Sequence, residues 1–494
     1  MTRRRMHNGV HRVISGAARL FGATGLVDSW RAERTLQLAS PIFVTSALRT
    51  LLRTTDFFLI SIALGDAAIA ALEFGYQYYF LTLTVGMVVA NGSISVVSRY
   101  VGSGNHRDAD FTVKQALWIV LVFSAPISYG CWCYADWLMA LLTDDAKAIA
   151  LGATYLRIAM LALPFRSWSL VALRSLQGAG DTLTPMLVRA ISLPTNIVLS
   201  AVLIFGIGSF PELGIAGAAW GLVIAQTLAS TIFLGVALSG RFAIQLCPFE
   251  RRWWDWTIVA ELLKVGAPLG GRRLVRYGVR FPFLWVLATL GTPVVAAYAI
   301  SQRIIRFARL PSNGIGTATA SLVGQELGAG EEQEAEVYGT QITWISIVLQ
   351  GGTAVVIMAF APVLVGLFGL GNLRLGVVFV WVFGIGVFAQ SVERVMRGSL
   401  QAAGDTTFPF YGTVIGKGFR LGFALLALPA GYVVASLAGR SFAPGIGIGI
   451  AAVFLGVLAD YYSQAIVCVY RYLSGTWKTV ARRSAVGAAG EGND

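Results

Sequence analysis

Charge is scarce in this sequence of 494 residues. Asp, Glu, Lys and Arg together make up 13% of the chain, while hydrophobic residues make up 56%, and the mean hydropathy is +0.69. This composition excludes an ordinary soluble globular protein. The alternation of polar and apolar residues that is typical of a transmembrane β-barrel is also missing. The sequence therefore predicts a polytopic membrane protein built of helices.

Histidine and cysteine are also few, and their positions do not suit metal or proton chemistry inside a membrane. The 3 histidines lie outside the apolar runs, and the 4 cysteines lack the spacing of metal ligands. We therefore expect no histidine proton relay, no metal centre and no cofactor. Because no nucleophile motif is present either, we do not expect an enzyme. These residues are His7, His11, His106, Cys131, Cys133, Cys247 and Cys468.

Long apolar runs, in contrast, fill nearly the whole chain. Each is long enough to cross a hydrocarbon layer of about 30 Å as a helix, which takes about 20 residues. We expect an all-α integral membrane protein with twelve transmembrane helices. The expected spans are 36–64, 69–98, 112–142, 148–177, 185–207, 212–239, 257–290, 294–325, 337–368, 373–401, 408–433 and 442–472.

The distribution of lysine and arginine predicts the orientation in the membrane. Both termini and the loops after even-numbered spans are rich in these residues, whereas the other loops hold little beyond Lys147, Arg374 and Arg440. Both termini are therefore expected in the cytoplasm of a prokaryotic cell, with the spans in its cell membrane. No short apolar core with a cleavage site follows the basic start, so we expect no signal peptide. The net charge of +13 is not gathered in a soluble domain, which argues against a nucleic-acid partner.

An internal repeat divides the chain into two halves. The segment "SLQGAGDTLTP" at 175–185 returns as "SLQAAGDTTFP" at 399–409, an offset of 224. Each half holds six of the expected spans, so the halves should share one orientation and be related by an axis along the membrane normal. We expect a basic cytoplasmic arm at 1–35, an N-terminal lobe at 36–239, a linker at 240–256, a C-terminal lobe at 257–472 and a cytoplasmic tail at 473–494.

The repeated segment has the composition of a tight turn between two helices. Gly180 can adopt the left-handed conformation that ends a helix. Asp181 or Thr184 can cap the next helix, and Pro185 suits its first turn. The second copy offers Gly404 in the same role. We therefore predict two equivalent turns.

The sequence resembles a known family at these segments. "QGAGDTLTPM", "AAGDTTFPF", "PELGIAGAAWGLVIAQ" and "ATASLVGQELGAG" are similar to signatures of the MATE (multidrug and toxic compound extrusion) transporters, in particular the DinF-like branch of the MOP flippase superfamily. The resemblance covers about residues 36–480. It implies two pseudo-symmetric six-helix lobes around a central cleft, and efflux of organic compounds in exchange for H⁺ or Na⁺. The loop motif of the major facilitator superfamily is absent after the second span.

The same resemblance implies an ion-coupling site in the N-terminal lobe. Its aspartate on the first helix matches Asp56. The fifth helix retains Asn196, but Ser200 stands where family members often carry an aspartate, so a hard anionic ligand for Na⁺ is missing and H⁺ coupling is favoured. Glu73 is a second candidate acid. The alternative is that both acids are structural, since Asp56 lies three residues after Arg53.

Arginines recur at matched places in the two halves. "PIFVTSALRTLLR" from Pro41 and "PLGGRRLVRYGVR" from Pro268 both read Pro-x₇-Arg-x₃-Arg. Arginines four residues apart lie on one face of a helix, so we expect them to line the substrate cleft. The pairs are Arg49 with Arg53 and Arg276 with Arg280; the eighth span adds Gln302, Arg303 and Arg306, which match Tyr76, Gln77 and Phe80 of the second span.

These arginines bear on the charge of the substrate. NorM-like relatives carry an acid near the position of Arg276, and a negative charge there suits cationic drugs. An arginine at this position makes the charge of the site positive instead. Guanidinium groups stay charged and bind carboxylate or phosphate with two hydrogen bonds. The sequence therefore allows an anionic or phosphate-bearing substrate, with a cationic or amphiphilic drug as the alternative. A third possibility is that the arginines are structural and pair with acids or helix-end carbonyls.

The predicted function is secondary active antiport of small organic compounds by alternating access of two lobes. A flippase of the same superfamily, acting on an anionic, phosphate-bearing lipid-linked precursor, is the alternative. A monomer is expected.

Overall fold

The computed structural model describes residues 14–23, 25–141, 146–239, 254–367, 373–433, 435–437 and 440–489. Within these ranges, side chains are not described at 49–74 and at a few further positions, among them Gln77. The chain forms two compact units. The C-unit comprises 1–39, 271–323 and 331–494, and the N-unit comprises 40–270 and 324–330.

Three helices contribute residues to both units. They are α2 (Ser29–Gly102), α8 (Trp256–Thr289) and α10 (Leu310–Gly328). The unit boundaries fall after Ala39, Gly270 and Val323. Residues 257–270, which the repeat places at the start of the C-terminal lobe, therefore contact the N-unit. The spans 36–64 and 69–98 were predicted as two helices joined near Gly65, but the backbone of α2 is helical without interruption through that place.

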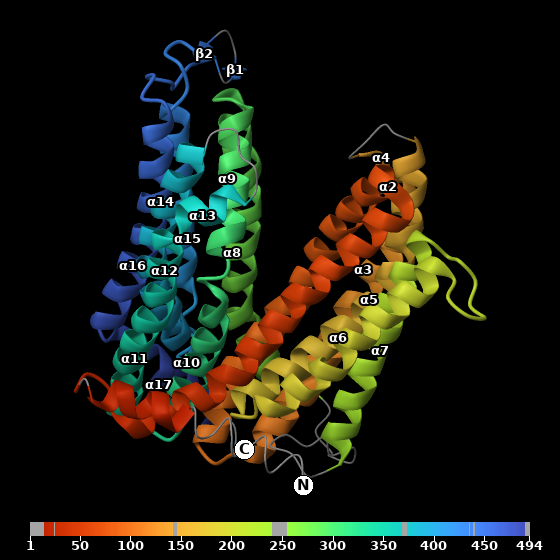
Figure 1. Ribbon diagram of the computed structural model, residues 1–494. Helices are drawn as coiled ribbons and strands as arrows, with labels where there is room; N and C mark the ends of the chain where they lie inside the picture. The colour runs from red at the N-terminus through yellow and green to blue at the C-terminus, as the bar shows by residue number, and fades with distance from the viewer. Residues whose placement is uncertain are drawn as a thin grey trace. The chain divides into compact units, whose positions relative to one another are not determined.

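The N-unit is a helical bundle with an apolar core. Besides its part of α2 it contains α3 (His106–Cys133), α4 (Ala135–Ala140), α5 (Ala146–Gly178), α6 (Leu183–Phe205) and α7 (Ile215–Leu238), drawn in orange to green in Figure 1. Helix α7 packs closely on α6 because Gly221 has no side chain: a Cβ there would lie 2.9 Å from the backbone nitrogen of Ser200. This approach fixes the face of α6 that turns into the unit.

The C-unit is a second helical bundle, and its part from residue 271 onward is shown from green to blue in Figure 1. Its core includes an aromatic cluster in which Tyr298 contacts Phe283, Phe379 and Phe383. Beyond α8 and α10, its elements are α9 (Thr292–Ile305), α11 (Glu332–Ser346), the π-helical turn η1 (Ile347–Gly351), α12 (Gly352–Ala359), α13 (Ala361–Gly366), α14 (Leu373–Ala402), α15 (Thr407–Leu426), α16 (Ile450–Leu473) and α17 (Thr476–Ala489).

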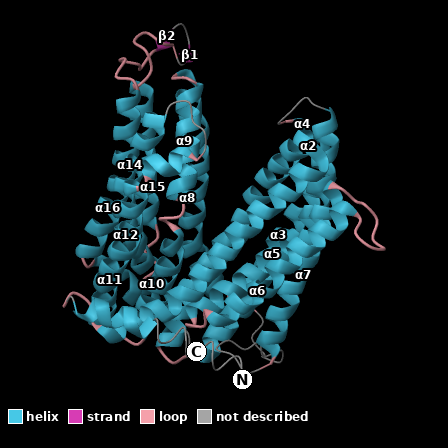
Figure 2. Cartoon of the chain, viewed as in Figure 1, coloured by secondary structure: helices cyan, strands magenta, loops and turns pink. Residues whose placement is uncertain are grey.

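The described chain is almost entirely helical, as Figure 2 shows. The exception is a small antiparallel hairpin of β1 (Ala435–Leu437) and β2 (Arg440–Phe442) between α15 and α16. Eight helices in the described ranges are long and apolar enough to cross a membrane. The predicted span 442–472 begins later, at Ile450, because the hairpin and a loop precede it. The predicted span 337–368 is divided among α11, η1, α12 and α13.

The two predicted turns have the expected backbone. Gly180 and Gly404 adopt positive φ angles of 88° and 84°, and the backbone nitrogen of Thr184 donates to Asp181 over 2.9 Å. The second copy differs, because the Asp405 carboxylate accepts a hydrogen bond of 2.6 Å from Arg471 on α16. Burial raises the pKa of the Asp405 carboxyl above its ordinary value, and the hydrogen bond from Arg471 opposes that rise. The turns are thus alike in backbone and different in their ion pairs.

Candidate functional site

The predicted coupling residues on α6 lie together in the interior of the N-unit. Asn196 and Ser200 are each 2% exposed, and their spacing of four places them on one helix face. The Asn196 side-chain oxygen is buried and has no hydrogen-bond partner in the described part of the chain. An amide oxygen in this setting can accept a hydrogen bond or contact a cation.

The other predicted residues of the first half fall largely outside the described side chains. This applies to Arg49, Arg53, Asp56, Glu73 and Gln77. Their predicted roles therefore stay predictions.

Tyr76 of the predicted cleft is described, as is Phe80 one turn later, and both are half-buried. The Tyr76 ring stacks on Phe80 at 5.9 Å and meets Tyr155 of α5 edge-on at 5.7 Å. At this place the second span therefore presents an aromatic surface that packs inside the N-unit.

A buried arginine joins three helices of the N-unit. Arg189 on α6 is 1% exposed and donates to Gln226 of α7 over 3.2 Å and to Ser169 of α5 over 3.1 Å. Arg166 also donates to Gln226, over 3.5 Å. The sequence reasoning did not select Arg189, although a lone arginine within the apolar run of the fifth span is a recognisable signal.

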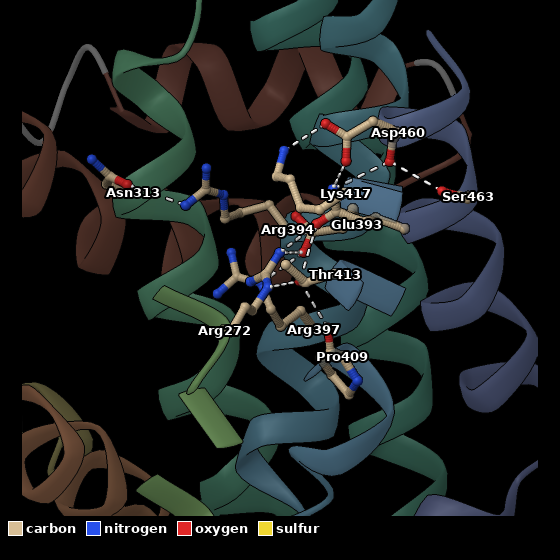
Figure 3. A network of polar contacts seen from close by, with 11 residues as sticks. Arg272, Asn313, Glu393, Arg394, Arg397, Pro409, Thr413, Lys417, Asp460 and Ser463 are labelled. Atoms are coloured by element: carbon tan, nitrogen blue, oxygen red, sulfur yellow. Dashed lines mark hydrogen bonds and ion pairs between the residues drawn. The ribbon is translucent and has the colours of Figure 1, made fainter. Parts of the chain in front are cut away.

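The C-unit contains a buried ionic network around Glu393 of α14 (Figure 3). Arg272 of α8 forms a salt bridge with Glu393 and also donates to Thr413 of α15. Its guanidinium further donates to Gln464 of α16 over 3.1 Å. Arg397, one turn after Glu393, donates to the same carboxylate over 2.9 Å. One acid thus holds two arginines and ties α8, α14, α15 and α16 together.

Glu393 and Arg397 lie near the end of the predicted span 373–401, where the sequence favours ion pairs between a lobe and its loops. The structure corrects this interpretation. Their partner is instead Arg272 on a neighbouring helix, and both side chains of that pair are buried, at 6% and 7% exposure. Arg272 itself was missed, although it extends the spacing of Arg276 and Arg280 by one more step of four residues.

A second ionic group lies around Asp460 of α16, which is fully buried. Lys417 of α15 donates to its carboxylate over 2.5 Å, and Gln464 donates over 2.7 Å. The Arg420 guanidinium lies 2.8 Å from the same carboxylate. None of Lys417, Arg420 and Asp460 was selected from the sequence, although all three interrupt apolar runs.

The predicted eighth span is interrupted between α9 and α10. The chain turns at 306–309, where Arg309 and Leu310 hydrogen bond three residues back rather than four. Pro311 explains the break, because it has no N–H and its ring clashes with the carbonyl four residues earlier. The turn carries Arg309 to Tyr461 of α16, and the guanidinium donates to its hydroxyl over 3.1 Å.

The arginines predicted for the substrate cleft in the second half are exposed: Arg276, Arg280, Arg303 and Arg306. Arg276 is nonetheless within electrostatic range of Glu393 and Asp460. Arg280 is within range of Tyr298, and Gln302 donates to the Tyr298 hydroxyl over 3.4 Å. The structure thus brings Arg276, Arg280 and Gln302 to the edge of the buried networks.

Positive charge exceeds negative charge in this part of the C-unit. The described helical segments from α8 to α16 that belong to the unit, apart from the acidic start of α11, carry two acids, Glu393 and Asp460. The cations around these acids are Arg272, Arg276, Arg394, Arg397, Lys417 and Arg420. Arg280 and Arg309 lie within electrostatic range of Tyr298 and Tyr461. Such a site favours an anion and repels a cation.

The repeat shows how the halves have diverged at these positions. At the offset of 224 that relates the two turns, Asn196 of α6 corresponds to Arg420 of α15, and Ser200 corresponds to Ala424. Arg189 corresponds to Thr413. A neutral oxygen that can contact a cation in the first half is therefore replaced by a fixed positive charge in the second.

Comparison with known proteins places both halves in one family. A family model described as MatE matches residues 41–202 and 268–426. The chain belongs to the MatE family. The two matched segments correspond to the two copies of the repeat, and the members of the family are transporters rather than enzymes.

Curated relatives of this MatE chain are similar over most of their length. A probable multidrug resistance protein NorM from Bradyrhizobium diazoefficiens is 26% identical over 84% of this chain and 89% of its own. A probable multidrug resistance protein YoeA from Bacillus subtilis is 23% identical over 89% and 92%.

Solved structures confirm the MatE fold. A MATE structure in a bent conformation has a TM-score of 0.81 at 20% identity, covering 92% of this chain and 97% of its own. A MOP superfamily transporter from Pyrococcus furiosus, described by a reversed polarity of its binding pocket that suggests a different function, has a TM-score of 0.79 at 19% identity, covering 90% and 96%. The expected fold, a helical membrane protein of the MATE type, is thereby confirmed.

Proposed function

We propose that this MatE protein is a secondary active antiporter that exports small organic compounds in exchange for H⁺ or Na⁺. The observation that carries the proposal is the family match in both halves of the chain. The names of the relatives from Bradyrhizobium and Bacillus, which refer to multidrug resistance, support export of organic compounds. Alternating access of the two halves is the transport cycle that such a repeat favours.

The ion-coupling step is assigned to the first half. Asp56 is the coupling acid in this proposal, with Asn196 and Ser200 on α6 and Glu73 as further polar groups. The buried, unpartnered oxygen of Asn196 supports a polar site in the N-unit. H⁺ is the favoured ion because a serine hydroxyl at position 200 is a poorer Na⁺ ligand than a carboxylate.

A second candidate function is favoured by the excess of cations in the C-unit. A flippase for an anionic, phosphate-bearing lipid-linked precursor would use the same arginines. It would move a lipid without an obligatory counter-ion, so the two functions differ in ion flux. In both cases the protein is a multi-pass protein of the cell membrane, and we propose cytoplasmic termini and a monomer.

The coupling proposal is tested by transport into proteoliposomes with an imposed pH gradient. Asp56→Asn should abolish gradient-driven transport of an organic substrate, since the amide cannot exchange a proton. Asp136→Asn is the matched control, because Asp136 is an exposed residue of α4 that pairs with Arg157. Transport by Asp56→Asn at the parent rate would exclude Asp56 as the coupling acid.

A further inference from the structure

We propose that the C-unit binds an organic anion at a cluster of three arginines and two tyrosines, which come from four helices and one helix break. The ligand carries one oxyanion group, a carboxylate, phosphate or sulfonate, on an aromatic or apolar body. This inference rests on the proposed function, because it names the class of compound that is transported. The residues are Arg280 of α8, Tyr298 of α9, Arg309 between α9 and α10, Arg420 of α15 and Tyr461 of α16.

Direct contacts join Arg309 and Arg420 to Tyr461, and the Phe283 ring links Arg420 to Tyr298. The Arg420 guanidinium lies over the Tyr461 ring at 5.0 Å and over Phe283 at 5.4 Å. Arg309 donates to the Tyr461 hydroxyl, as described above. Tyr298 is within electrostatic range of both Arg280 and Arg420. Arg309, Tyr461, Arg420 and Tyr298 therefore form one contiguous group, and Arg280 lies within electrostatic range of it.

The charges of the cluster are not balanced. Its nearest acid is Asp460, and that carboxylate already contacts Lys417 and Arg420. Neither Arg280 nor Arg309 has an acidic partner in the part of the chain that is described. Guanidinium groups stay charged at any ordinary pH, so titration cannot remove this excess. An anionic ligand would neutralise it.

Hydrogen-bond donors of the cluster are also unused. Arg420 is 7% exposed, and its Nη2 has no hydrogen-bond partner among the described groups. The same holds for the buried Nε of Arg309. A buried donor without a partner costs free energy, and a charged one costs more. A carboxylate or phosphate oxygen would satisfy these donors with charge-assisted hydrogen bonds.

The break between α9 and α10 is an independent observation that points to a ligand. Non-helical backbone at membrane depth is tolerated where it is buried in protein or lines a cavity. In transporters built from repeats, interrupted helices commonly form the substrate site. Here the break carries Arg309 into the cluster. The rings of Phe283, Tyr298 and Tyr461 beside it would contact the apolar body of the ligand.

The exposed fractions of the five side chains indicate from which side a ligand would enter the cluster. Arg280 is exposed and Arg309 is half-buried, whereas Tyr298, Arg420 and Tyr461 are buried. A ligand would therefore meet Arg280 first and then the deeper donors. Substitution of Arg280 and Arg309 tests binding with the least disturbance of the core.

The test measures binding by calorimetry to the full-length protein in nanodiscs of phosphatidylcholine, which carries no net charge. The probes are 2-naphthoate and 2-naphthylmethylammonium, which have the same ring system and opposite charge. We expect 2-naphthoate to bind and the ammonium not to bind. Arg280→Gln and Arg309→Gln should each weaken 2-naphthoate binding by about ten- to a hundredfold, the loss expected for a hydrogen bond between charged groups. Arg374→Gln, an exposed arginine at the start of α14, is the control and should bind as the parent does.

Thermal unfolding of each variant establishes that it is folded. Arg309→Lys keeps the charge and loses the planar fork, so it should bind with intermediate affinity. Equal 2-naphthoate affinity in the parent, Arg280→Gln and Arg309→Gln overturns the proposal. A preference of the parent for the ammonium probe also overturns it.

A second arm identifies the source of the anion. The titration is repeated in nanodiscs that mix phosphatidylcholine with phosphatidate. Competition by phosphatidate that is lost in Arg280→Gln supports the site and assigns it to a lipid phosphate. Unchanged binding of 2-naphthoate supports the site and assigns it to soluble organic anions.

The outcome for the anion site is separable from that for antiport. Binding of 2-naphthoate without any gradient-driven transport contradicts the antiport and leaves the anion site standing. Gradient-driven transport of cations without binding of 2-naphthoate contradicts the anion site and leaves the antiport standing.

Discussion

At the scale of single residues, the C-unit depends on carboxylates that each serve more than one cation. Glu393 accepts from Arg272 and Arg397, and Asp460 contacts Lys417 and Arg420. A buried ion pair contributes little net stability by itself, but removing one partner leaves an uncompensated charge. In each group, loss of the acid therefore costs more than loss of one cation.

Glu393→Gln should lower the free energy of unfolding by about 3–5 kcal/mol, because Arg272 and Arg397 would remain charged and buried. Thermal unfolding in detergent, followed by circular dichroism, measures the change. Glu212→Gln is the control, since Glu212 is exposed in the loop before α7. A melting temperature for Glu393→Gln equal to that of the control would contradict the assigned role of this carboxylate.

Glycine at position 221 is required for the close approach of α7 to α6. In Gly221→Ala the new Cβ would overlap Ser200, and overpacking of this kind costs about 1–3 kcal/mol. At Gly235 of α7 a Cβ would meet no atom within 4 Å. Gly235→Ala should therefore leave stability unchanged or raise it by about 0.5–1 kcal/mol. In one unfolding experiment, Gly221→Ala should lower the melting temperature below that of the parent, and Gly235→Ala should not. Equal melting temperatures for the two variants would rule out the packing argument.

At the scale of elements, the acidic start of α11 joins both ends of the chain. Arg31 at the start of α2 pairs with Glu334 at 2.8 Å. From α17, Lys478 and Arg482 pair with Glu336 and Glu332, each at 2.5 Å. The hydrogen bond to Glu332 raises the pKa of Arg482 above its ordinary value. The sequence alone does not indicate these pairings, because the partners are more than a hundred residues away.

Helix α17 is attached by an apolar contact beneath these ion pairs. Trp477 is fully buried, stacks on Tyr472 at 5.3 Å and donates to its carbonyl over 2.9 Å. Trp477→Ala should lower the free energy of unfolding by about 3–5 kcal/mol. Trp137→Ala, at an exposed position of α4, should have little effect. Proteolysis within α17 should accelerate in Trp477→Ala alone, and equal cleavage of both variants would disprove the attachment.

At the scale of the whole molecule, the fold class was predictable because its signals are local and repeated. Apolar runs predict membrane helices, and the duplicated turn with Gly180 and Gly404 shows that the halves are related. The helix break at Pro311 and the hairpin before α16 were not predicted, because hydropathy does not distinguish a continuous span from an interrupted one.

The candidate site was predictable only in part. Arg276 and Arg280 were selected by spacing and Gln302 by its match to the second span, and all three lie beside the buried networks. Arg420 and Asp460 were missed because their pairing joins two different helices, α15 and α16, and the spacing of residues within one helix does not show it. Periodicity identifies the face of a helix, but not the neighbour that the face meets.

The measurement that tests the central claim most directly is proton movement during transport. Proteoliposomes that contain the protein, a pH indicator and a Na⁺ indicator are given an organic substrate on one side, without any imposed ion gradient. Secondary antiport predicts that the substrate causes H⁺ to cross the membrane in the direction opposite to substrate flow. This H⁺ flux should be absent in Asp56→Asn. Substrate or lipid movement with no accompanying H⁺ or Na⁺ flux would contradict the account and favour the flippase.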